Sequence, residues 1–152
     1  MRIRDAMTPS PASCEPGTSI RTVAQLMIKL DCAAIPVTAS GRVIGIVTDR
    51  DIACRAVAQH PNAAELPVSA CMSQPVIAVT PDEPVEKAVE LKEENAIHHL
   101  PVIGPDGTLL GIIALSDLGR RMTNREFGAL ARMTSIRSRY PRRSSSALVK
   151  SH

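Results

Sequence analysis

PVTASGRVIGIVTDRD, residues 36–51, contains two short apolar runs joined by a turn at Ser40-Gly41, and a helix start follows at Thr48. A near copy, PVIGPDGTLLGIIALSD, occupies residues 101–117. Two apolar runs around a glycine-containing turn predict a β-hairpin, and Thr48 is a good N-terminal residue for the next helix. The second copy indicates that the chain is built from an internal repeat.

The repeat extends well beyond the hairpin and keeps one register. At an offset of 65 residues, identical residues coincide at Met7/Met72, Pro16/Pro81, Leu26/Leu91, Pro36/Pro101 and Val37/Val102. The second turn is one residue longer, so the offset becomes 66, and it pairs Gly41/Gly107, Gly45/Gly111, Ile46/Ile112 and Asp51/Asp117. Units of about fifty residues are small for separate cores, so we expect the two to share one core.

Hydrophobic periodicity predicts the same β-α-β-β-α order in each unit, and therefore an α/β fold of the α+β type. The expected first repeat spans residues 3–60, a linker spans 61–70, the second repeat spans 71–122 and a tail spans 123–152. Strands are expected at 34–37, 43–47, 76–79, 99–103 and 109–114, with helices at 20–30, 49–59, 85–96 and from 115. Helix 85–96 carries six charged residues, Glu86, Lys87, Glu90, Lys92, Glu93 and Glu94, which we expect to form a solvated face.

Composition separates the body from the tail. Only 1% of residues are aromatic, so the core must be aliphatic. Residues 123–152 carry seven Lys/Arg and one Glu, a charge of +6, whereas residues 1–122 carry eleven Lys/Arg and fourteen Asp/Glu, a charge of −3. The Ser/Arg-rich end lacks apolar periodicity, which favours disorder there.

Several functional classes find no support in the sequence. The cysteines Cys14, Cys32, Cys54 and Cys71 show no metal-binding spacing, and no hydrolase, Walker A or metalloprotease motif is present. No apolar run approaches the length of a membrane span, and Met1 leads directly into the first repeat without an apolar leader. We therefore expect a cytoplasmic protein with free thiols, no metal site and no catalytic residues.

Two sets of motifs resemble the CBS (cystathionine β-synthase) domain. The first is Met7-Thr8 with the run Gly45-Ile46-Val47-Thr48-Asp49-Arg50-Asp51, and the second is Met72-Ser73 with His98-His99-Leu100-Pro101-Val102 and the run 111–117. The resemblance spans roughly residues 3–122. It implies a Bateman-type pair, in which two repeats pack through small mixed sheets about a pseudo-twofold axis. Such pairs resemble small bacterial regulatory proteins that bind AMP, ADP, ATP or sometimes S-adenosylmethionine in two clefts, and they often form homodimers.

The first-repeat motif suits a nucleotide. Asp51 can accept two hydrogen bonds from a ribose diol, and Thr48 at the helix start can meet a phosphate. Ile46 and Ala33 are expected to hold the adenine between aliphatic walls, with Arg50 as a further phosphate contact. The same spacing is also a helix-capping motif, so Thr48 and Asp51 have two interpretations of similar weight.

The second repeat keeps Asp117 and Ile112 but has Ala114 in place of Thr48. Because alanine cannot cap, we interpret the retained Asp117 as a ligand-binding residue. The resemblance places His98 and His99 where related repeats contact phosphate, whereas the first repeat has Ala33-Ala34 there. We assign the histidines to the Asp117 cleft and expect its affinity to fall between about pH 6 and 8, as imidazolium is lost.

The sequence therefore predicts a non-catalytic adenine-nucleotide sensor that acts as a homodimer on an unknown regulated protein. Two alternatives stay open. The basic tail can bind nucleic acid or an acidic partner through Arg137, Arg139, Arg142 and Arg143. Alternatively, the pair is degenerate and serves only as a dimerisation scaffold.

Overall fold

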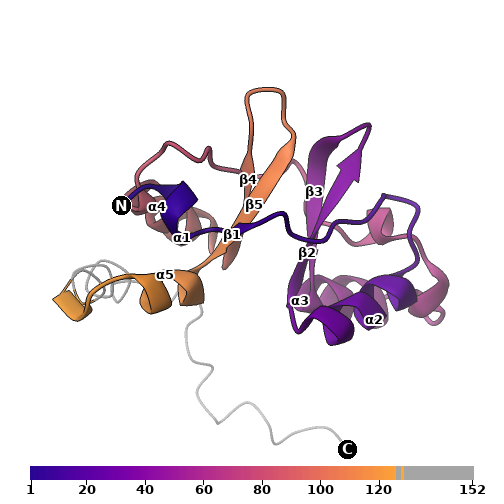
Figure 1. The fold of residues 1–152 in the computed structure, drawn as a ribbon. Helices are drawn as coiled ribbons and strands as arrows, with labels where there is room; N and C mark the ends of the chain where they lie inside the picture. Colours follow the sequence, from indigo (N-terminus) through magenta and orange to yellow (C-terminus); the bar gives the residue numbers. More distant parts are fainter. Residues whose placement is uncertain (126–127, 129–152) are drawn as a thin grey trace, which may run out of the picture.

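The computed structural model describes residues 1–125 and residue 128. Almost all of the expected tail, including its four arginines, lies outside these residues. The two repeats lie side by side, each with a small sheet and its own helices (Figure 1). The predicted mixed α/β arrangement of two repeats is confirmed.

The first half contains α1 (Ile3–Ala6), β1 (Thr8–Pro9), α2 (Ile20–Leu30), β2 (Ala34–Ala39), β3 (Arg42–Thr48), α3 (Asp49–Asp51) and the π-helical turn η1 (Ile52–Val57). The second half contains η2 (Ala63–Glu65), η3 (Val68–Ala70), α4 (Val85–Asn95), β4 (His99–Ile103), β5 (Leu109–Ala114) and α5 (Leu115–Arg121). Ser19 caps α2, because its Oγ accepts the Thr22 N–H at 3.1 Å. Helices α2 and α4 both end at a left-handed residue, Asp31 or Ala96.

Each hairpin turn contains backbone with positive φ, at Ser40 and Gly41 in the first and at Gly107 in the second. Ser40 has φ 51° and Gly41 has φ 75°, the combination that a tight two-residue hairpin turn requires. Strands β2 and β3 pair antiparallel from Ala34↔Thr48 to Ala39↔Arg42, with an irregularity after Val37. Strands β4 and β5 pair in the equivalent register, with the irregularity after Val102.

The segment that leads into each repeat, which we call its leading segment (residues 3–9 and 68–74), packs on the other repeat. Strand β1 pairs with β5 through Thr8↔Ile112, and Ser73 forms the equivalent bridge to Ile46 in β3. Glycine at position 45 permits this approach, because a Cβ there would stand 2.9 Å from the Ser73 carbonyl oxygen. In Figure 1 the N-terminal chain accordingly lies beside α4 before crossing to the first repeat.

This exchange corrects the expectation of one shared core. The buried residues form two separate clusters, one around Val23, Ile35 and Val47 and the other around Val89, Leu100 and Ile113. Each cluster is completed by the other repeat's leading segment. Ile3 and Ala6 enter the second core, and Val68, Cys71 and Met72 enter the first. Two small cores suffice because each borrows apolar side chains from its neighbour.

Three local expectations also differ from the structure. Residues 76–79 do not form a strand; within them Val79 makes a single bridge to Val102, after the cis peptide bond Gln74–Pro75. Residues 61–70, expected as a linker, form the turns η2 and η3, and Val68 is fully buried. Lys92, expected on a solvated face, is only 6% exposed.

Candidate functional site: two clefts between the repeats

Two cavities lie where the helix start of one repeat faces the β-strand entry of the other. The first, which we call the Asp51 cleft, measures about 280 Å³ and is lined by Ile46, Thr48 and Asp51 together with Ile97 and His98. The second, the Asp117 cleft, measures about 460 Å³ and is lined by Ile112, Ala114 and Asp117 together with Ala33 and Ala34. Both volumes are near the lower end of the range of about 300–1,000 Å³ that is typical of ligand pockets.

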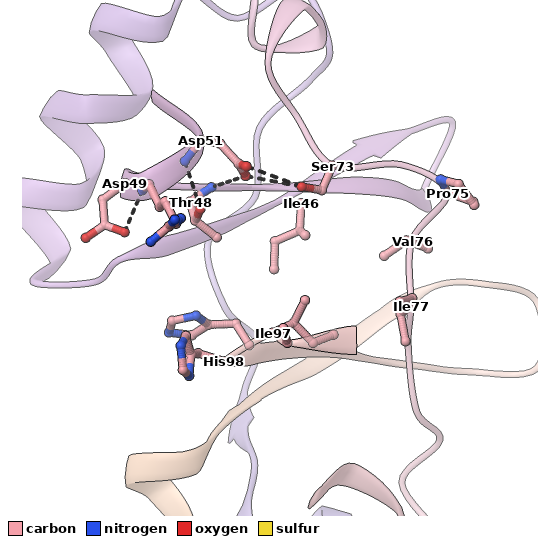
Figure 2. Close-up of a pocket in the computed structure, with 13 residues that line it drawn as sticks. Ile46, Thr48, Asp49, Asp51, Ser73, Pro75, Val76, Ile77, Ile97 and His98 are labelled. Atoms are coloured by element: carbon pink, nitrogen blue, oxygen red, sulfur yellow. Dashed lines mark hydrogen bonds between the residues drawn. The ribbon is translucent and has the colours of Figure 1, made fainter. Parts of the chain in front are cut away.

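The polar wall of the Asp51 cleft is the start of α3 (Figure 2). Thr48 Oγ1 accepts the Asp51 N–H at 3.1 Å, and Asp51 Oδ2 accepts the Thr48 N–H at 3.0 Å. This reciprocal pair is a capping box, so the capping interpretation is confirmed. Both residues nevertheless line the cavity, so capping and ligand binding are compatible.

The second oxygen of Asp51 has partners outside its own helix start. Ser73 Oγ lies 3.3 Å from Asp51 Oδ1 and donates a hydrogen bond to it, and Arg55 lies 3.8 Å from the same oxygen. The carboxylate is 12% exposed, whereas the Arg55 side chain is half exposed. Ser73 lines this cleft but was not among the predicted site residues, although the sequence placed it in the Met72-Ser73 motif that aligns with Met7-Thr8.

The opposite wall is apolar, with histidines at one end. Figure 2 shows Ile97 and His98 across the cavity from Thr48 and Asp51, with Val76 and Ile77 closing the far end. Arg50 lines the same cleft, as expected for a phosphate contact. Ala33 does not, because it lies in the Asp117 cleft. The expected aliphatic pair of Ile46 and Ala33 is therefore wrong, and Ile97 takes the place of Ala33.

The Asp117 cleft shows why Asp117 is retained without a threonine. Asp117 Oδ2 accepts the Ala114 N–H at 2.9 Å, which is half of a capping box and needs no hydroxyl. The argument that only a ligand explains Asp117 therefore fails, since the carboxylate satisfies an otherwise unpaired backbone donor. Thr8, Ser116 and Arg120 supply further polar groups around this cavity.

The assignment of the histidines to the Asp117 cleft also needs correction. The β4 entry faces the Asp51 helix start, so His98 lines only the Asp51 cleft and His99 lines both. The reason is the packing of the repeats, which places each strand entry opposite the helix of its partner. Burial, followed by the charge of Lys92, lowers the pKa of His99 below its ordinary 6.5. His99 thus loses its charge at a lower pH than an ordinary histidine, so it gives less support to a fall in affinity that depends on imidazolium between about pH 6 and 8.

The remaining reactive side chains are dispersed. Within residues 1–125, no three His, Cys, Asp or Glu side chains gather in a geometry that could hold a metal ion. Cys14 and Cys71 are buried, Cys32 lines the Asp117 cleft and Cys54 is exposed. Among the described helices, none is long and apolar enough to cross a membrane.

Comparison with known proteins supports the repeat alignment. The family model described as "CBS domain" matches residues 3–56 and again residues 68–124. The CBS domain-containing protein YhcV of Bacillus subtilis is 36% identical over 128 residues, which cover 84% of this chain and 90% of that protein.

A solved structure and an enzyme extend the comparison. The CBS domain pair of protein MJ0100, in complex with 5′-methylthioadenosine and S-adenosyl-L-methionine, superposes with a TM-score of 0.73 at 27% identity. The match covers 85% of this chain and 97% of that one. The homoserine O-acetyltransferase of Methanohalophilus mahii is 35% identical over 115 residues, or 75% of this chain but only 23% of the enzyme. That similarity therefore concerns one part of the enzyme.

Proposed function

Because this chain belongs to the CBS domain family and contains two such domains in tandem, we propose that it is a non-catalytic regulatory protein that binds an adenine nucleotide. The observation that carries the proposal is the Asp51 cleft. It combines the carboxylates of Asp49 and Asp51, two histidines and an aliphatic wall, and it draws them from both repeats.

Each part of an adenosine ligand finds a suitable partner in this cleft. The carboxylate of Asp51 is an acceptor for the ribose 2′- and 3′-hydroxyls, a charge-assisted arrangement that can be bidentate. Ile46 and Ile97 offer aliphatic surface to the adenine, and no aromatic ring is needed. His98 and Arg50 are placed to meet the phosphate end, since both line the same cavity.

The solved structure of MJ0100 with its bound ligands supports the adenosine part of the proposal. MJ0100 was solved with two adenosine-containing molecules, one of them a sulfonium cation without phosphate. Adenosine recognition is therefore the common element, and the group attached at the 5′ position is where ligands of AMP, ADP, ATP or S-adenosylmethionine type differ. We propose AMP-class nucleotides for the Asp51 cleft because of His98 and Arg50.

The proposed role is regulatory, with a protein partner that reads the ligand state. The matched domain covers nearly all described residues, and the enzyme relative contains it as a minor part of its length. A two-domain pair of this kind transmits ligand binding because the ligand bridges both repeats. Nucleic-acid binding through the tail concerns residues outside the described ones.

Isothermal calorimetry with AMP, ADP, ATP, adenosine and S-adenosylmethionine tests the proposal. Asp51→Asn keeps an oxygen that can cap the helix but removes the charge. We expect it to weaken AMP binding at this cleft about tenfold or more, the value of one charged hydrogen bond. Glu94→Gln, on an exposed position of α4, is the control and leaves binding unchanged. Binding of no adenosine ligand, or full binding by Asp51→Asn, would contradict the proposal.

A further inference from the structure

The least expected residue of the fold is Lys92. It occupies the inward face of α4 with Val85, Ala88 and Val89, and its side chain is only 6% exposed. Its Nζ is buried and has no hydrogen-bond partner among the described residues. An unpaired buried ammonium is costly, so its presence calls for an explanation beyond packing.

The first repeat shows what the position needs for packing alone. Lys92 corresponds to Met27 at the offset of 65, and Met27 is buried to a similar degree, at 8% exposure. Their backbones are equivalent, because the carbonyl of Met27 accepts the Cys32 N–H at 3.0 Å and that of Lys92 accepts the Ile97 N–H at 3.0 Å. A methionine thus satisfies this site structurally. The lysine adds a charge of no structural value.

The surroundings of the ammonium connect it to a cleft. Two charged or titratable groups interact electrostatically with the ammonium. The carboxylate of Asp117, at the start of α5, raises the pKa of Lys92, and the ammonium lowers the pKa of His99, at the start of β4. Both line the Asp117 cleft. The other neighbours in this core are apolar, among them Ile3 and Ala6 of α1. The carbonyl of Lys92 accepts the Ile97 N–H, two residues before His99, so Lys92 adjoins the β4 entry and is within electrostatic reach of the part of the cleft wall that Asp117 and His99 form.

We propose that Lys92 is the buried cation that makes the Asp117 cleft prefer anionic adenosine ligands, acting through the wall that Asp117 and His99 form. This inference rests on the proposed function and adds a ligand class for the second cleft. Thr48 and His98 have no counterparts there, because their equivalents are Ala114 and Ala33. A fixed charge in a low-dielectric wall acts on a phosphate without touching it.

The protonation of Lys92 gives the proposal a pH signature. Burial lowers the pKa of Lys92 from 10.5 to about 8, although the carboxylate of Asp117 opposes the shift. The ammonium is thus present at pH 7 and largely lost at pH 9. Over that interval the second ionisation of a phosphate monoester, near pKa 6, is mostly complete, so the ligand charge changes little.

The decisive variant is Lys92→Met, which copies the first repeat. The control is Lys87→Met, which removes the same charge from an exposed position of the same helix. Both are made in an Asp51→Asn background, so that the Asp117 cleft is read alone, and calorimetry compares AMP with uncharged adenosine. We expect Lys92→Met to weaken AMP about tenfold while adenosine changes less than about twofold, since the field acts on charge. Lys87→Met should change neither.

The pH profile, measured in the same Asp51→Asn background, is the second readout. With Lys92 present, AMP affinity at this cleft should fall several-fold between pH 7 and pH 9, and in Lys92→Met it should stay flat. Equal AMP affinity in Lys92→Met, an equal loss for adenosine, or a flat profile with lysine present overturns the inference. If Asp117→Asn still binds AMP but Asp51→Asn binds neither ligand, the inference fails and the proposed function stands. If neither single variant binds an adenosine ligand, both fail.

Discussion

The two helix starts form a natural comparison, because one has a complete capping box and the other has half. Thr48 and Ala114 have nearly the same backbone, with φ −115° and ψ 164° against φ −108° and ψ 157°. The carboxylate half of the box is present in both, at 3.0 Å and 2.9 Å. The missing element at the second site is one hydroxyl that would accept the Asp117 N–H. Ala114→Thr supplies it without a change of backbone.

The size of the effect follows from one cap hydrogen bond. We expect Ala114→Thr to raise the free energy of unfolding by about 1 kcal/mol relative to Ala114→Val, which has the same shape but no hydroxyl. In a chain of this size that corresponds to an increase of about 2–4 °C in Tm. The reciprocal change Thr48→Ala should lower the free energy of unfolding by about 1 kcal/mol.

Urea unfolding followed by circular dichroism measures all three variants. The m value must stay constant, so that a changed midpoint reports stability. The valine variant removes the contribution of added volume and β-branching at a partly buried position. If Ala114→Thr is no more stable than Ala114→Val, the hydroxyl does not cap the helix. That result would also refute the interpretation that the Thr48 hydroxyl stabilises its helix start by accepting the Asp51 N–H.

Three further expectations follow from the packing. Folding lowers the pKa of Lys92 from 10.5 to about 8, so the protonated side chain opposes folding. Lys92→Met removes this penalty and should be more stable than the parent protein at pH values below about 8. That advantage should shrink by on the order of 3 kcal/mol as the pH rises from about 8 to 10.5. Urea titrations at several pH values measure this. The buried cysteines are the same in both proteins, so their contribution to the pH dependence of stability cancels in the difference. Gly111→Ala places a Cβ 3.0 Å from a carbonyl oxygen of β1 and should cost about 1–3 kcal/mol, whereas Gly17→Ala, with open space around it, should be nearly neutral by the same assay. Light scattering should return a homodimer, since Ile28 and Val57 remain 82% and 63% exposed; a monomer of 16.3 kDa at micromolar concentration contradicts this.

The sequence predicted the parts of the fold that depend on local pattern. The offsets of 65 and 66 correctly paired Gly45 with Gly111 and Met7 with Met72, and the structure shows these pairs in equivalent contacts. The hairpin turns and the helix starts also follow from residues close in the chain. The repeat could not reveal which unit each segment packs on. Packing within a repeat and packing across repeats give the same aligned residue pairs, so the internal alignment does not distinguish them.

The same limit explains the errors at the candidate site. Ala33 and His98 were assigned to each other's clefts because their own repeat was taken as their partner. Lys92 was misread for a different reason, as one charge among six on a helix. A signal was present, because Lys92 follows Val85, Ala88 and Val89 at helical spacing and replaces the buried Met27.

The exchanged leading segments also set an order of events during synthesis. Ser73 follows its partner Ile46 by 27 residues, so the first sheet can be completed soon after it emerges from the ribosome. Thr8 precedes its partner Ile112 by 104 residues, which is about 5–20 s of translation. Throughout that interval Ile3 and Ala6 lack the core that buries them in the finished protein. The second repeat thus completes its fold by recruiting a segment that was synthesised about a hundred residues earlier, and a chaperone that holds residues 1–9 would delay that repeat while leaving the first free to form.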